Sequence, residues 1–276
     1  MSRFAGKVAI VTGSSNGIGR ATAILLGQQG AKVTITGRNK ERLEETAKFL
    51  KNVGTDVNVV TGDITSTPCQ DELVKSTLEK FGKIDILVNN AGAAFTDDDS
   101  SKIGIDSGID VFKRTLDVNI VSVVQLIQKC KPHLISTKGE IVNVSTIASE
   151  QSAFIHYTYY GMAKAAMDQM TRCTALQLIS QGVRVNSVSP GFVETGFLTA
   201  FGFEEPIAQK VNDYYQTNRD CIPAGVVGKP DDIAKCIAFL ADRDSSSYII
   251  GQNIVIDGGT SLVVAMSTHD LSKILA

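Results

Sequence analysis

Seven short apolar segments recur along the chain of 276 residues, and each is rich in β-branched side chains. They cover residues 7–12, 32–36, 56–63, 83–90, 139–146, 182–190 and 253–259. Nearly unbroken apolar runs of this length are typical of strands covered on both faces, because neither face then needs polar side chains. The pattern therefore predicts seven buried strands.

Amphipathic stretches such as residues 19–30, 39–54 and 230–242 separate these runs and predict helices. One helix start is marked locally, because Ser66 or Thr67 suits an N-cap and Pro68 suits the first turn that follows. Regular alternation of strand and helix favours a parallel sheet with helices on both faces. We therefore expect a doubly wound α/β (Rossmann) fold built on a seven-stranded parallel sheet.

Composition fits one domain over residues 1–276. Hydrophobic residues make up 43% of the chain and charged residues 20%, and no long linker-like segment interrupts it. The most loop-like stretch, residues 93–108, follows the fourth strand. The net charge is −2 and no basic block stands out, so we expect no nucleic-acid partner.

Other protein classes are disfavoured by what the chain lacks. No apolar run reaches the length of a membrane span, and the N-terminal residues do not read as a signal peptide. The histidines lie far apart without metal-ligand spacing, so no metal site is predicted. Scattered cysteines fit free thiols in a reducing, cytoplasmic compartment. These residues are His133, His156, His269, Cys69, Cys130, Cys173, Cys221 and Cys236.

Three glycines, Gly13, Gly17 and Gly19, stand where the first strand gives way to the first helix. Glycines allow a tight turn and a close approach of the backbone to a ligand. The free N–H groups and the dipole of a helix start favour a phosphate at this place. The alternative is a plain strand-to-helix turn without a ligand.

Tyr160 and Lys164 are four residues apart in a predicted helix, so their side chains share one face. An ammonium beside a phenol favours the phenolate and lowers the pKa of the phenol. A phenol tuned in this way can exchange a proton with a carbonyl or alcohol oxygen. The alternative is an ordinary surface pair, whereas Tyr159 is expected to have a packing role.

Taken together, these motifs resemble the short-chain dehydrogenase/reductase family in its single-domain form. Thr12–Gly19 matches the family pattern Thr-Gly-x3-Gly-x-Gly, and the Tyr-x3-Lys pair follows in the expected order. Between and after them come the other matching segments, which are residues 89–92, Asn119, 141–146, 189–195 and 251–259. The resemblance spans roughly residues 5–260 and implies an NAD(P)-dependent oxidoreductase.

The resemblance also implies a role for each matching residue. Tyr160 would be the general acid/base, Lys164 would lower its pKa and bind the nicotinamide ribose, and Asn119 would hold a water molecule. Asp63 and Ile64 would contact adenine, and Asn90, Ala91 and Gly92 would pass beside the ribose. The remaining expected cofactor contacts are Gly13, Ser15, Asn16, Gly17, Ile18, Gly19, Tyr160, Lys164, Pro190, Gly191, Val193 and Thr195.

The catalytic hydroxyl departs from the family pattern. The family usually carries a serine 13 residues before the tyrosine, but that position is Ile147 here. Aligning the strand instead places Thr146 at the catalytic position, with Ser145 as the alternate hydroxyl. Neighbouring residues of a strand point to opposite faces, so only one of the two should serve. We prefer Thr146.

The end of the second strand bears on the choice of dinucleotide. An acid there would bind the ribose hydroxyls of NAD, whereas a basic side chain would accept the 2′-phosphate of NADP. This chain has Gly37 followed by Arg38, and no acid appears before Glu41. We therefore expect NADP(H), held by Arg38 and by Asn39 or Lys40, with NAD(H) as the alternative. The glycine turn itself lacks the basic residue that many NADP-dependent members carry.

The expected substrate side is apolar. Residues 192–221 occupy the position of the family's mobile substrate loop, and residues 261–276 form a tail that packs on a neighbouring subunit or on the site. The aromatic and aliphatic residues in question are Phe154, Ile155, Phe192, Phe197, Leu198, Phe201 and Phe203. They favour a lipophilic or medium-sized carbonyl substrate, although core packing explains them equally well. The resemblance further implies a homo-oligomer, either a dimer or a tetramer.

Two alternatives to an NADP(H)-dependent carbonyl reductase follow from the same residues. One is an NAD-dependent alcohol or sugar dehydrogenase. The other is a dinucleotide-binding sensor without turnover, which only the replacement of the usual serine by threonine supports.

Overall fold

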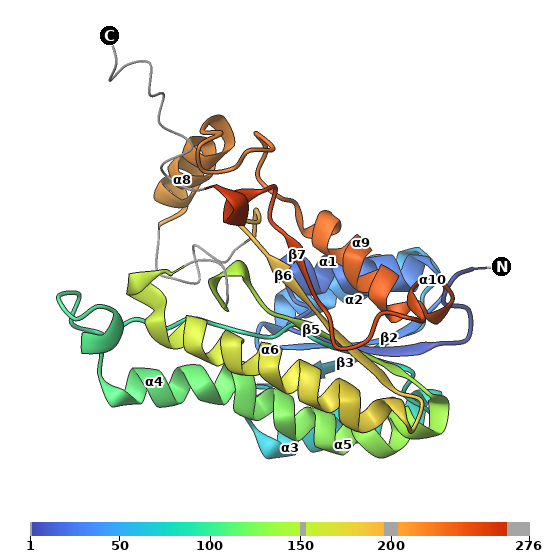
Figure 1. The fold of residues 1–276 in the computed structure, drawn as a ribbon. Coiled ribbons are helices and arrows are strands. Elements are labelled where there is room, and N and C mark those ends of the chain that lie inside the picture. The colour runs from blue at the N-terminus through green and yellow to red at the C-terminus, as the bar shows by residue number, and fades with distance from the viewer. Residues whose placement is uncertain (1, 150–152, 196–203, 264–276) are drawn as a thin grey trace, which may run out of the picture.

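The computed structural model describes residues 2–149, 153–195 and 204–263. Its seven strands form a single parallel sheet in the order β3-β2-β1-β4-β5-β6-β7, which confirms the predicted doubly wound fold (Figure 1). The strands are β1 (Val8–Thr12), β2 (Lys32–Gly37), β3 (Val57–Thr61), β4 (Ile86–Asn89), β5 (Glu140–Val144), β6 (Arg184–Pro190) and β7 (Asn253–Ile256). Each lies within its predicted segment or differs from it by one residue.

Helices cover both faces of the sheet. On one face lie α1 (Gly17–Gln28), α2 (Lys40–Asn52), α9 (Pro230–Ala241) and the short α10 (Arg243–Ser246). On the other lie α3 (Thr67–Phe81), α4 (Ile109–Leu116), α5 (Ser122–Thr137) and α6 (Thr158–Ile179). The predicted start of α3 is confirmed: Ser66 is its N-cap and Pro68 lies in its first turn, although the Ser66 side chain makes no capping hydrogen bond.

The two helical layers bury two separate cores, one on each face of the sheet. One core packs α1, α2 and α9 against the sheet and includes Leu26, Leu43 and Ile237. The other packs α3, α5 and α6 and includes Leu126 and Met167. Both faces of the sheet are therefore covered, and the loops that follow the strands converge at its carboxyl edge.

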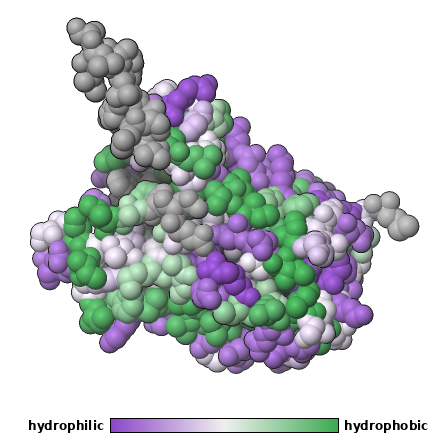
Figure 2. All heavy atoms as spheres, viewed as in Figure 1, coloured by the Kyte–Doolittle hydropathy of each residue, from purple (hydrophilic) through white to green (hydrophobic). Residues whose placement is uncertain are grey.

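At that carboxyl edge the strand order changes direction between β1 and β4, which is where doubly wound folds bind ligands. A separate helix, α8 (Glu205–Thr217), lies beyond the end of β6 (Figure 1). Short 3₁₀ turns η1 (Gly104–Asp106), η3 (Ile147–Ser149), η4 (Ile155–Tyr157) and η5 (Thr260–Leu262) occur in the remaining connections. Hydrophobic residues gather at the end of the molecule where α4 begins, on the left of Figure 2.

At the opposite edge of the sheet a buried ion cluster joins β5 and β6 to α9 and α10. Glu140 lies 2.9 Å from Arg184 and 2.7 Å from Arg243. Arg184 is 1% exposed, and it donates to the carbonyl oxygens of Leu240 at 2.8 Å and Ser246 at 2.7 Å. One side chain therefore satisfies acceptors on three elements.

Replacing Arg184 by Met should lower the free energy of unfolding by about 3–5 kcal/mol, because it leaves a buried carboxylate and three carbonyl oxygens short of donors. Urea denaturation measures this change. Lys129→Met is the matched control, since the Lys129–Asp71 pair is partly exposed and should contribute about 1 kcal/mol or less. Equal effects of the two substitutions would contradict the role given to Arg184.

Within the described ranges, no helix is both long and apolar enough to cross a membrane. The same residues contain no group of three or more His, Cys, Asp or Glu side chains arranged to hold a metal ion. The five cysteines are free thiols.

Candidate active site

The glycine turn joins β1 to α1 in a conformation that excludes side chains. Gly13 has a φ of +65°, in the left-handed region. A β-carbon at Gly19 would lie 2.3 Å from the Gly13 carbonyl oxygen, so no larger residue fits there. The Asn16 side chain accepts from the Gly17 N–H at 2.8 Å and caps α1. The turn is thus a cradle whose backbone a phosphate can approach closely, which fits a dinucleotide.

The turn is joined to the end of β4 by hydrogen bonds. The Asn90 amide donates to the carbonyl oxygens of Thr12 at 2.8 Å and Gly13 at 3.2 Å. In return, the Thr12 hydroxyl accepts from the N–H groups of Asn90 and Ala91, each at 2.9 Å. The backbone of residues 90–92 therefore has a set position beside the glycine turn, as expected for two segments that share one ligand.

At the end of β2, Arg38 is exposed and its charge acts on Asp63. The pKa of Asp63 is lowered, first by a hydrogen bond from the Thr65 N–H and also by the Arg38 guanidinium. Gly37 adds no side chain here, and a β-carbon on it would lie 3.1 Å from Ser15 Oγ. Arg38, Asp63 and the glycine turn therefore border one region at the carboxyl ends of β1, β2 and β3.

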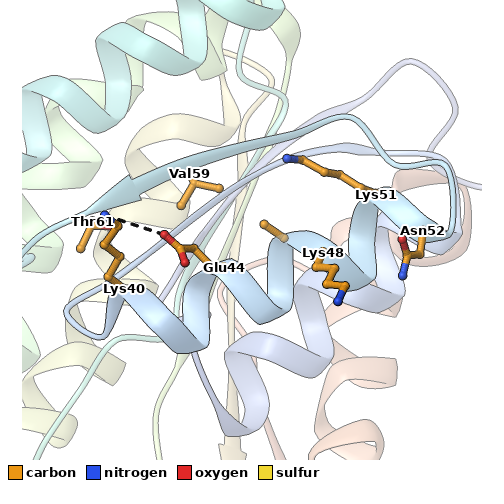
Figure 3. A pocket seen from close by; sticks show the side chains of 8 residues that line it. Lys40, Glu44, Lys48, Lys51, Asn52, Val59 and Thr61 are labelled. Carbon is orange, nitrogen blue, oxygen red and sulfur yellow. Dashed lines mark ion pairs between the residues drawn. The ribbon is translucent and has the colours of Figure 1, made fainter.

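Asn39 and Lys40, the two further candidates for a phosphate, have other partners. Asn39 caps α2 and accepts from the Arg42 N–H at 2.9 Å. Lys40 pairs with Glu44 at 3.8 Å in a groove of about 480 Å³ between α2 and β3 (Figure 3). Among the three side chains expected at the 2′-phosphate, Arg38 is therefore the main candidate left.

Asn119 lies in η2 (Asp117–Val121), a π-helical turn between α4 and α5. Its side-chain amide donates to the carbonyl oxygens of Ala93 at 2.6 Å and Thr115 at 2.8 Å. Its Oδ1 accepts from the Ala93 N–H at 3.3 Å. Such single widened turns are frequent at functional sites, and this one fastens residue 93 to the fully buried Asn119.

Lys164 is buried on α6 and reaches the same place. Its Nζ donates to the Val144 carbonyl oxygen at 2.7 Å. A β-carbon on Gly92 would lie 2.8 Å from Asn119 Oδ1 and 3.3 Å from Lys164 Nζ. Gly92 is therefore the small residue that allows the amide of Asn119 and the ammonium of Lys164 to approach each other from different elements.

Tyr160 and Thr146 meet through their hydroxyl groups, which share a side-chain hydrogen bond. Thr146 is the second residue after β5 and is partly exposed, whereas Ser145 is buried and its Oγ has no hydrogen-bond partner among the described residues. Ile147, at the family's usual serine position, is buried. The structure therefore brings Thr146, rather than Ser145, to the tyrosine.

The pKa of Tyr160 differs from the value expected from its neighbour Lys164. Lys164 Nζ stands 5.8 Å from the centre of the Tyr160 ring, yet burial raises the pKa of the phenol, opposed only by the Thr146 hydrogen bond. The predicted lowering of the Tyr160 pKa by Lys164 was wrong for the protein alone, because desolvation of the buried phenol is the largest effect on it. Burial also lowers the pKa of Lys164 to about 8, against the opposing charge of Asp168.

The segment after β6 closes over the glycine turn. The Gly191 N–H donates to the Ile256 carbonyl oxygen at 3.0 Å, and Val193 forms a bridge with Gly228. The Thr195 side chain lies against Gly17, where a β-carbon would be 3.1 Å from Thr195 Cγ2. Thr195 thus lies against the glycine turn, and Pro190, Gly191 and Val193 lead the chain from β6 to this contact.

On the substrate side, Phe154 and Ile155 are exposed by 49% and 64%. Phe192 contacts the ring of Tyr215 on α8, with centroids 4.5 Å apart. Ile64, which was expected to contact adenine, packs against the hydrophobic core beneath α3. Four of the predicted pocket residues, together with residues 264–276 of the tail, lie outside the described residues. They are Phe197, Leu198, Phe201 and Phe203.

Three residues gain roles that sequence reasoning did not assign. Thr12 joins the glycine turn to Asn90, Asp168 places a charge beside Lys164, and Tyr159 binds the loop before α4. Asp168 follows Lys164 by four residues, so its helical spacing was a usable signal. The other two depend on partners distant in sequence, for which the chain carries no local signal.

Comparison with known proteins agrees with this arrangement. A family model described as “Enoyl-(Acyl carrier protein) reductase” matches residues 13–261. That range contains the glycine turn, Asn119, Thr146, Tyr160 and Lys164.

Solved structures and curated proteins resemble the chain over nearly its whole length. A Caenorhabditis elegans short-chain dehydrogenase/reductase of unknown function, crystallised with cofactor, is 53% identical with a TM-score of 0.95, covering 97% of this chain and 100% of that one. Glucose dehydrogenase of the same organism, in its apo-form, is 51% identical with a TM-score of 0.79, covering 95% and 100%. The 3-oxoacyl-(acyl-carrier-protein) reductase FabG of Thermotoga maritima is 34% identical, covering 93% of this chain and 98% of its own.

Proposed function

The chain belongs to the short-chain dehydrogenase/reductase family of oxidoreductases, and we propose that it interconverts a ketone or aldehyde and the corresponding alcohol with NADP(H). The observation that carries this proposal is the hydrogen bond between Thr146 and Tyr160 beside a buried lysine. These groups end at the same sheet edge as the glycine turn, so a substrate oxygen and a cofactor can meet there.

The residues would act on the substrate oxygen as follows. When bound, the nicotinamide supplies the hydride for the carbonyl carbon. Tyr160 donates its proton to the carbonyl oxygen, and the Thr146 hydroxyl hydrogen-bonds the same oxygen. The raised pKa of Tyr160 suits this step, because the phenol keeps its proton at neutral pH until the oxygen becomes basic. Lys164 and Asn119 lie behind Tyr160 and would return the proton from solvent.

The cofactor preference rests on Arg38. A guanidinium beside the end of β2 can bind a 2′-phosphate, and neither Gly37 nor Arg38 offers the carboxylate that would bind an unphosphorylated ribose. Asp63 lies near Arg38, but its carboxylate already accepts two hydrogen bonds from Thr65. The support for NADP(H) is therefore one exposed cation without a competing acid on β2.

Arg38→Asp should weaken NADPH binding about ten- to a hundredfold while leaving NADH binding equal or stronger, because a charged hydrogen bond is replaced by repulsion. Titration followed by nicotinamide fluorescence measures both constants. Lys51→Asp is the control. It makes the same change in charge, but Lys51 lies in the last turn of α2, away from the end of β2. An unchanged ratio of the two constants would move the phosphate site elsewhere.

A second candidate function is an NAD-dependent alcohol or sugar dehydrogenase, which the resemblance to a glucose dehydrogenase favours. The first experiment separates the two: the protein is titrated with NADPH and with NADH, and a panel of ketones, aldehydes and sugars is then assayed. Preference for NADH with sugar oxidation would replace our proposal. Tight binding without any turnover would indicate a dinucleotide sensor.

We include a homo-oligomer in the proposal. Exposed apolar residues lie on the outer faces of the segments that bear Asn119 and Tyr160, where Leu176 is 78% exposed, and in β7, where Val255 is 38% exposed. Two such areas fit two kinds of subunit contact, and sedimentation velocity would distinguish a monomer, dimer and tetramer. The free thiols support a reducing, cytoplasmic setting.

A further inference from the structure

The segment between β4 and α4 is a loop that begins at the candidate site. At one end, residue 93 is held by two hydrogen bonds to Asn119. At the other, the Asp97 carboxylate accepts from the Gly108 N–H at 2.7 Å, at the start of α4. The Asp97 pKa is lowered by this hydrogen bond and by one from Asp99. We refer to residues 93–108 as the β4–α4 loop.

This loop contacts the first turn of α6 through Tyr159. The Tyr159 hydroxyl lies 2.8 Å from the Ser107 carbonyl oxygen and 3.2 Å from that of Ile105. A phenol has one proton to donate, so the shorter contact is the principal hydrogen bond. The Tyr159 ring also meets the edge of Phe112 on α4, with centroids 5.0 Å apart.

A second contact brings the backbones together. Gly104 in η1 is buried, with a φ of +58°. A β-carbon on it would lie 2.3 Å from the Ile155 carbonyl oxygen and 3.1 Å from Thr158 Oγ1. The loop thus lies directly against η4 and the start of α6, as Figure 1 shows for the segment before α4.

Tyr159 and Tyr160 are adjacent on one helix, where successive side chains point about 100° apart. One therefore faces the β4–α4 loop while the other meets Thr146. The loop presents apolar side chains next to this helix start: Ile105 is 73% exposed, and Ile155 across the contact is 64% exposed. Hydrophobic residues are visible at this end of the molecule in Figure 2.

Building on the proposed function, we propose that Tyr159 is a positioning residue that holds the β4–α4 loop as an apolar wall of the substrate opening, and so restricts the bulk of the carbonyl compound admitted. Only the hydroxyl of Tyr159 bonds the loop, whereas its ring packs on Phe112. Tyr159→Phe therefore keeps the packing and releases the loop.

The first test measures the loop without any turnover. Trypsin can cut after Lys102, which is exposed in the loop. In Tyr159→Phe the rate of cleavage between residues 102 and 103, followed by mass spectrometry, should rise about fivefold, since the loop loses a hydrogen bond worth roughly 1 kcal/mol. Gly104→Ala should raise it independently, because its β-carbon cannot fit against Ile155. Tyr248→Phe, at a fully exposed tyrosine, is the control and should leave the rate unchanged.

The second test compares a small ketone, butanone, with a bulky apolar one, decalone. Tyr159→Phe should change the ratio of their KM values by about fivefold, while kcat for butanone and the Kd for NADPH stay within about twofold. Unchanged proteolysis together with an unchanged KM ratio would overturn the proposal. Equal losses for both ketones and for NADPH would also overturn it, because Tyr159 would then only support α6.

The two tests also separate this inference from the function it rests on. If the unaltered protein reduces no carbonyl compound but Tyr159→Phe still speeds cleavage after Lys102, the proposed function fails and the anchoring of the loop stands. If carbonyl reduction is found and the cleavage rate does not respond to Tyr159→Phe or Gly104→Ala, the anchoring fails and the function stands.

Discussion

Tyr160→Phe should lower kcat for carbonyl reduction by at least about a hundredfold, which is the lower range for loss of a general acid. The substitution removes only the hydroxyl that bonds to Thr146, and it leaves the ring packed beside Lys164. The glycine turn and Arg38 are untouched, so the Kd for NADPH should stay within about threefold. Steady-state kinetics and fluorescence titration measure the two quantities.

Tyr248→Phe is the matched control for this prediction, because its side chain is 98% exposed. It should leave both kcat and the Kd for NADPH unchanged. If Tyr160→Phe retained activity within a few-fold of the original protein, another group would have to donate the proton. If it lost NADPH binding as well, its effect would be structural and would say nothing about proton transfer.

Thr146→Ala should lower kcat about a hundredfold, by analogy with the loss of one hydrogen-bond donor to a reacting oxygen. Ser145→Ala should leave kcat within about threefold, because the Ser145 hydroxyl is buried without a partner among the described residues. Thr146→Ser keeps the hydroxyl and should restore most of the activity. The measurement is kcat with saturating NADPH and one ketone.

The comparison of the Thr146 and Ser145 variants can also contradict the assignment of the catalytic hydroxyl. A larger loss in Ser145→Ala than in Thr146→Ala would reverse the assignment of the hydroxyl. Failure of Thr146→Ser to recover activity would mean that the methyl group, rather than the hydroxyl, is what the site needs. Thermal denaturation of each variant checks that the losses do not arise from unfolding.

The fold was predictable because its pattern repeats. Apolar β-branched runs are typical of strands buried on both faces, and their regular alternation with helical segments favours one parallel sheet covered by helices. Local signals were equally informative where a single residue decides: Pro68 and Ser66 mark the start of α3. The π-helical turn at Asn119 carries no such signal, since it depends on how α4 and α5 meet.

The kinds of side chain that make up the candidate site could also be predicted from the sequence. Helical spacing pairs Tyr160 with Lys164, and the glycines of the turn exclude side chains whatever surrounds them. Cofactor type was inferred from the absence of an acid after β2, which is a property of sequence. The fold then gave two of the three candidate side chains other partners, because Asn39 caps α2 and Lys40 pairs with Glu44.

Proton affinity and long-range contact depended on the tertiary structure. Sequence reasoning placed an ammonium beside the phenol and expected a lowered pKa for Tyr160, yet burial raises it, because desolvation comes from every element packed around the ring. The hydrogen bonds of Thr146 to Tyr160 and of Tyr159 to the β4–α4 loop likewise join residues from different elements. The sequence determines the chemistry of each side chain and its spacing from its neighbours along the chain. Exclusion of solvent and hydrogen bonds between distant residues arise only when the helices and strands have packed together.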